Sequence, residues 1–92
     1  MRIDLFLKTV GLAKTRMAAK RLCENQSILL GGLPVKPSRE ILAGETLEIQ
    51  LPLKKIRAEI LGVPSTNSVA KRDRSKFVSV RTEENREFPS EP

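Results

Sequence analysis

The first 25 residues follow a helical period. Apolar residues recur there at three- and four-residue spacing: Ile3, Phe6, Leu7 and Val10. We expect Asp4 to cap this helix, because its carboxylate can accept hydrogen bonds from the free N–H groups of the first turn. Gly11 is expected to end it in a left-handed conformation. The pattern therefore predicts a short first helix with one apolar face.

A second helix is predicted from Arg16 to about Asn25. Thr15 is a favourable N-cap residue, and Asn25-Gln26 is expected to end the helix, since Asn tolerates the left-handed conformation best after Gly. The side chains expected to face the core are Met17, Ala18 and Leu22, with Cys23 as a further candidate.

The period then changes to two. Ser27–Leu30 is predicted to form a short strand, and Gly31-Gly32 suits a two-residue hairpin turn, in which φ must be positive. The returning segment 33–35 contains Pro34, so it is expected at a sheet edge or as an irregular strand. Pro37 disfavours helix at the residue before it, which predicts an extended loop at 36–38.

Three further strands are predicted at residues 46–50, 56–61 and 77–80, with a helical turn or a charged loop at 69–75. The order is two helices followed by strands that can pair as neighbours. We therefore expect an α+β domain in which two short N-terminal helices pack on a small antiparallel sheet.

Composition limits the possible chemistry. A chain of 92 residues suits one domain. It contains no His, so a histidine base or an imidazole metal ligand is excluded, and the single Cys23 cannot form a structural zinc site. We expect no enzyme activity, no cofactor and no metal. No apolar run approaches the ~20 residues of a membrane span, and the N-terminus does not resemble a signal peptide, so a cytoplasmic protein is expected.

Charge is strongly basic and uneven. Lys and Arg number 17 against 11 Asp and Glu, a net charge of +6, which favours a polyanionic partner. Residues 83–92 are acidic, end in prolines and hold few apolar groups. We expect them to form a disordered tail after a domain at 1–82. This tail could screen the basic residues of the second half of the chain.

The second predicted helix carries the clearest binding signal. Arg16 and Lys20 share one face, Arg21 is adjacent, and Lys14 precedes the cap. A helix N-terminus presents unpaired N–H groups and partial positive charge, so added cations make a reasonable phosphate site. An ordinary solvated helix face is the alternative interpretation.

A second cationic group lies in the predicted loop, where Lys36 and Arg39 flank Pro37 and Ser38. Arg2 and Lys8 could extend this patch. A third group, more simply read as solvated, is Lys54, Lys55, Arg57, Lys71, Arg72, Arg74 and Lys76. Aromatic residues are scarce, which disfavours base stacking on single strands and favours contact with the phosphates of structured RNA.

Five segments together resemble the RNA-binding domain named after protein four of the small ribosomal subunit. They are residues 2–7, 14–19, 28–32, 35–38 and 43–47, so the motif covers roughly residues 1–50. The resemblance implies an RNA-facing surface of Arg2, Lys14, Thr15, Arg16, Lys20, Lys36 and Ser38, to which charge and position add Lys8, Arg21 and Arg39. The family usually has Gly where Gln26 stands and Asn-Gly at the hairpin.

The length is similar to that of the stand-alone members of this family, such as the fifteen-kilodalton heat-shock protein and its relatives in ribosome quality control. That likeness implies binding to ribosomal RNA of the large subunit, at stalled subunits that still hold peptidyl-tRNA. We expect a monomer, with tRNA as a possible further partner. Two alternatives stay open. The helix pair could be a helix-turn-helix on DNA, or the protein could be an adaptor that binds other proteins through the edge strand near Pro34 or through the acidic tail.

Overall fold

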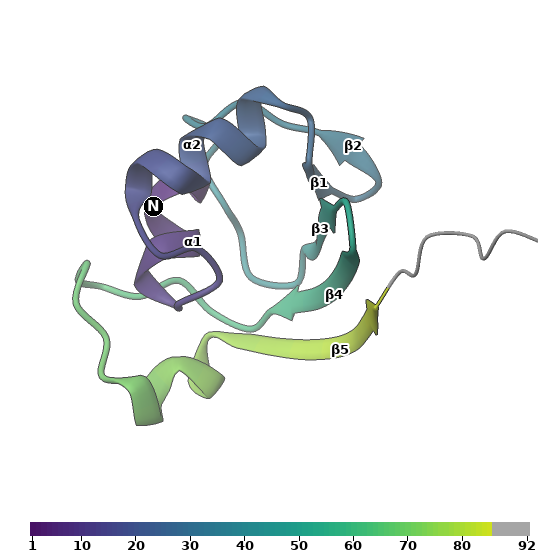
Figure 1. The fold of residues 1–92 in the computed structure, drawn as a ribbon. Helices are drawn as coiled ribbons and strands as arrows, with labels where there is room; N and C mark the ends of the chain where they lie inside the picture. The colour runs from purple at the N-terminus through teal and green to yellow at the C-terminus, as the bar shows by residue number, and fades with distance from the viewer. Residues whose placement is uncertain (86–92) are drawn as a thin grey trace, which may run out of the picture.

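The computed structural model describes residues 1–85, which form two α-helices, a five-stranded antiparallel sheet and one 3₁₀ helix (Figure 1). The elements are α1 (Ile3–Thr9), α2 (Arg16–Glu24), β1 (Ile28–Leu30), β2 (Leu33–Pro34), β3 (Thr46–Leu51), β4 (Lys54–Ile60), η1 (Lys71–Lys76) and β5 (Val78–Asn85). The strand order is β2-β1-β3-β4-β5. The predicted α+β class is confirmed.

Helix α1 buries the apolar face expected from its spacing, and Gly11 follows it with φ of 79°. Its start differs from the prediction. The N-cap residue is Arg2, and Asp4 lies inside the first turn, where its Oδ1 accepts a hydrogen bond from the Leu5 N–H at 2.8 Å. Asp4 is therefore not the cap; it is a buried residue of the helix.

Helix α2 begins as predicted, because the Thr15 Oγ1 accepts a hydrogen bond from the Ala18 N–H at 3.0 Å. Its core face was partly mispredicted. Ala19 and Cys23, four residues apart, are buried, whereas Met17 is 57% exposed. Met17 lies two positions before Ala19, which turns it to the opposite side of the helix.

The predicted hairpin and edge strand are confirmed. Gly31 and Gly32 both have positive φ, at 58° and 84°, and they join β1 to β2. Strand β2 pairs with β1 alone, so Pro34 sits at the edge of the sheet, where a residue without an N–H costs least.

The C-terminal part of the sheet is longer than predicted. Residues 69–75 were expected as a helical turn or a loop, and η1 shows that the helical turn is correct. Strand β5 continues to Asn85 and pairs with β4, placing Glu83 opposite Ile56 and Glu84 opposite Lys55. The tail predicted at 83–92 thus contributes three residues to the sheet; residues 86–92 lie outside the described chain.

One hydrophobic core joins both helices to the sheet. Its largest fully buried side chains come from α1, β1, β3, β4 and the loop before β3: Phe6, Ile3, Leu7, Ile28, Ile41, Leu47, Ile49 and Ile60. Figure 1 shows the helices together on one side, with the curved sheet passing around them. Within residues 1–85 no helix has the length and apolar character needed to cross a bilayer.

Candidate nucleic-acid interface

The residues before and at the start of α1 are hydrogen-bonded to the loop at 37–41. The Ile3 N–H donates to the Arg39 carbonyl at 2.8 Å, and the Asp4 N–H donates to the Pro37 carbonyl at 3.2 Å. The Ile41 N–H in turn donates to the Met1 carbonyl at 3.0 Å. These bonds bring Arg2 beside the Lys36 loop, although 34 positions separate them in the sequence.

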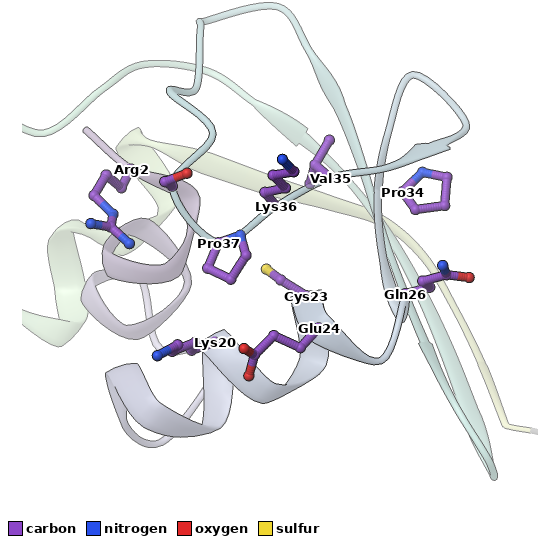
Figure 2. A pocket seen from close by; sticks show the side chains of 10 residues that line it. Arg2, Lys20, Cys23, Glu24, Gln26, Pro34, Val35, Lys36 and Pro37 are labelled. Atoms are coloured by element: carbon purple, nitrogen blue, oxygen red, sulfur yellow. The ribbon is translucent and has the colours of Figure 1, made fainter.

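A hollow of about 600 Å³ lies between this loop and α2. Its lining residues are Arg2, Lys20, Cys23, Glu24, Gln26, Pro34, Val35, Lys36, Pro37 and Ser38. Figure 2 shows the cationic side chains arriving from three separate segments, with the Cys23 sulfur pointing toward Pro37. The helix and the loop therefore share one concave surface.

A second hollow of about 290 Å³ adjoins the first, since both are lined by Arg2 and Lys20. Its remaining lining residues are Asp4, Arg16 and Met17. Taken together, the two hollows gather five of the ten residues predicted to bind RNA, namely Arg2, Arg16, Lys20, Lys36 and Ser38. We call this surface the cationic hollow.

Two arginines of the cationic hollow flank one buried acid. The Asp4 Oδ2 lies 3.1 Å from the Arg2 Nη2 and 3.5 Å from the Arg16 Nε. Lys20 and Lys36, in contrast, form no ion pair with any of residues 1–85. Their ammonium groups therefore remain available to an anionic ligand, and a concave cationic surface of this kind suits phosphates.

The other predicted binding residues lie elsewhere. Lys8, Lys14 and Arg21 are exposed on or beside the helices but line neither hollow. Thr15 uses its hydroxyl to cap α2. Arg39 differs most from the prediction of a free cation, because its guanidinium contacts both carboxylate oxygens of Glu45, at 3.2 and 2.6 Å. Arg39 thus holds the loop before β3 together.

Three of the seven residues of the third cationic group are paired with acids within the fold. Arg57 pairs with Glu48, Lys54 with Glu83 and Lys76 with Asp73. The guanidinium of Arg74 packs against Gly11, where a Cβ atom would collide with it. The Lys54–Glu83 pair agrees with the expectation that acids near the C-terminus screen cations of this group.

Sequence reasoning missed Asp4, Met17, Glu24 and Gln26 as part of the site. For Asp4 the sequence held one signal, a charged residue between the apolar neighbours Ile3 and Leu5. Cys23 was predicted to be an apolar core residue. Burial raises the pKa of its thiol to about 11, and the nearby charges of Asp4 and Glu24 act in the same direction to a smaller extent. No group of acids and Cys in residues 1–85 is arranged to hold a metal ion.

Comparison with known proteins agrees with this geometry. The S4 domain matches residues 1–47, just over half of the chain. The chain belongs to the S4 domain family. This is the RNA-binding family that the sequence resembles, and its matched region contributes every lining residue of the cationic hollow.

Relatives extend the similarity beyond the S4 domain. The chain is 36% identical to the RQC P-site tRNA stabilizing factor of Helicobacter pylori, over 91% of this chain and 100% of that protein. Its identity to the protein of the same name from Halalkalibacterium halodurans is also 36%, over 91% and 93% of the two chains. The fold resembles heat shock protein 15 of Vibrio cholerae, with a TM-score of 0.80 at 17% identity, covering 88% of this chain and 81% of that one.

Proposed function

We propose that this protein binds structured RNA through the cationic hollow and stabilises a tRNA on the large ribosomal subunit during ribosome quality control. The observation that carries the proposal is the gathering of Arg2, Arg16, Lys20 and Lys36 from three separate segments onto one concave surface. The relatives named as P-site tRNA stabilizing factors support it, because they match this chain over nearly its whole length.

The proposed role is binding without catalysis, in the cytoplasm and as a monomer. Absence of His and a Cys23 thiol that is protonated at neutral pH support a non-enzymatic role. The S4 domain also supports RNA as the partner over the two alternatives, a DNA-binding helix-turn-helix and a protein adaptor. We propose that the four cations of the hollow contribute most of the affinity for RNA. The other predicted residues remain proposed RNA contacts that contribute less: Lys8, Lys14, Thr15, Arg21, Ser38 and Arg39.

The proposal is tested by cosedimentation with purified large subunits that carry peptidyl-tRNA in the P site, with empty subunits alongside. Wild type is expected to bind the tRNA-bearing subunits more tightly. Lys20→Glu should weaken this binding by about tenfold or more, since it reverses a cation that has no partner within residues 1–85, and the dependence of log K on log salt should become shallower by about 1–2.

Arg72→Glu is the matched control, because Arg72 is exposed on η1 outside both hollows and the change in charge is the same. We expect it to change the affinity by less than about threefold, the range of a distant screened charge. A folded Lys20→Glu protein that sediments with the subunits as wild type does would refute the assignment of the surface.

A further inference from the structure

Asp4 is buried beneath the cationic hollow, with only 2% of its surface exposed. A buried carboxylate is costly unless its charge is compensated and its oxygens are hydrogen-bonded. Its Oδ1 accepts the Leu5 N–H at 2.8 Å, whereas Oδ2 faces the Arg2 Nη2 at 3.1 Å and the Arg16 Nε at 3.5 Å. One oxygen atom thus serves two guanidinium groups from two different helical segments.

This shared contact fixes where two like charges stand. Arg2 and Arg16 would repel each other if both were left unpaired, and long side chains lose conformational entropy when they are held in one place. The carboxylate between them offsets the repulsion. Both side chains nevertheless stay open to solvent, with exposures of 44% and 49%. Each arginine directs one nitrogen to the carboxylate, and a guanidinium has five N–H donors, so both groups keep donors for a ligand.

We propose that Asp4 is a positioning residue that holds Arg2 and Arg16 side by side as one preformed phosphate clamp, without itself contacting RNA. The inference rests on the proposed RNA-binding function and adds the group that organises its surface. Preorganisation of this kind increases affinity because the ligand does not have to order the two side chains when it binds.

A purely structural role is the competing explanation. Asp4 lies in the first turn of α1, where a carboxylate interacts favourably with the helix dipole. The two explanations differ in what an uncharged isostere does to RNA binding. Asn at this position keeps an oxygen for the Leu5 N–H but cannot neutralise two guanidinium groups.

The test compares Asp4→Asn with Glu24→Gln in tRNA-transcript binding at fixed salt. Each change removes one acid from the lining of the hollows and raises the net charge from +6 to +7. Charge alone therefore predicts tighter binding for both variants. A clamp organised by Asp4 predicts opposite signs, with Asp4→Asn about tenfold weaker than wild type and exposed Glu24→Gln equal or tighter.

Amide NMR spectra and thermal melts confirm that each variant is folded. Affinity of folded Asp4→Asn equal to or above that of wild type overturns the proposal, while the proposed function survives because wild type still binds. If the wild-type protein bound neither the tRNA transcript nor the large ribosomal subunit, the proposed function itself would be refuted.

A second measurement needs neither a variant nor RNA. In the wild-type protein, ¹⁵N relaxation of the Arg16 Nε–H should report an ordered side chain, with Arg21 as the internal reference because it is exposed and has no ion pair within residues 1–85. Equal mobility of the Arg16 and Arg21 guanidinium groups overturns the proposal, even if Asp4→Asn does not fold.

Discussion

Cys23 illustrates how burial sets the chemistry of one residue. Its side chain is 3% exposed and lies at the base of the larger hollow. Burial is the main cause that raises the pKa of its thiol to about 11, and the charges of Asp4 and Glu24 act in the same direction. At neutral pH Cys23 is therefore a neutral thiol, which neither cancels the positive charge above it nor acts as a ready nucleophile.

This shift makes stability depend on pH in the alkaline range. Because the thiol pKa rises from its ordinary value of 9.0 to about 11 in the fold, the thiol's contribution is complete below about pH 9 and is lost as the pH approaches 11. Urea unfolding should show that wild type loses about 1 kcal/mol more than Cys23→Ala between pH 8 and pH 10. Equal losses in the two proteins would contradict the shift.

The two ends of helix α2 differ in how well the sequence predicted them. Its start was predictable, because Thr15 caps the N–H of a residue three positions away. Its end has the hydrogen bonds of a Schellman motif, with the Ser27 N–H on the Leu22 carbonyl at 2.9 Å and the Gln26 N–H on the Cys23 carbonyl at 3.0 Å. This motif puts the left-handed residue at Gln26, whose φ is 60°, and not at Asn25 as predicted.

Gln26→Gly should stabilise the protein by about 0.5–1 kcal/mol. An L-residue in the left-handed region is strained by about 1–2 kcal/mol, and Gly relieves this strain. The greater conformational entropy of Gly in the unfolded chain offsets part of the resulting stabilisation. Chemical denaturation of wild type, Gln26→Gly and Gln26→Ala measures the effect. Gln26→Ala keeps the strain and serves as the control, so similar stabilisation by both substitutions would show that φ is not the cause.

Across the whole molecule, the core extends beyond the segment that forms the binding surface. The S4 match ends at residue 47, but Ile49, Ile56, Ala58, Ile60 and Val78 belong to the same buried cluster. Four of these residues belong to β4 and β5. Without those two strands, the apolar side chains that they cover in the first half of the chain would be exposed to solvent. The cationic hollow is therefore built on a scaffold completed by the second half of the chain.

A fragment of residues 1–50 is consequently expected not to fold by itself. Burial of Ile56, Ile60 and Val78 alone is worth about 1.5–3 kcal/mol per side chain, which together rivals the entire stability of a domain this small. A fragment of residues 1–85 should unfold cooperatively. Circular dichroism melts and amide NMR dispersion compare the two, and a cooperative melt of the shorter fragment would contradict the expectation.

Sequence alone determined the features that depend on neighbours a few residues apart. These include the apolar face of α1, the Thr15 cap, the Gly31-Gly32 turn and the edge position of the Pro34 strand. Each arises from local sterics or from a hydrogen bond within one turn, so the pattern carries the necessary information. The sequence alone also determined the net positive charge and showed the likeness to an RNA-binding family.

Tertiary structure decided which charges are available. The sequence offered no reason to separate Arg39 from Lys36 as an RNA contact. In the fold, the guanidinium of Arg39 pairs with the Glu45 carboxylate, whereas Lys36 lines the hollow. Asp4 was expected at a helix end, and only the packing of α2 against α1 places it between Arg2 and Arg16. The physical reason is that pairing and burial depend on distances between segments far apart in the chain, which local spacing does not encode.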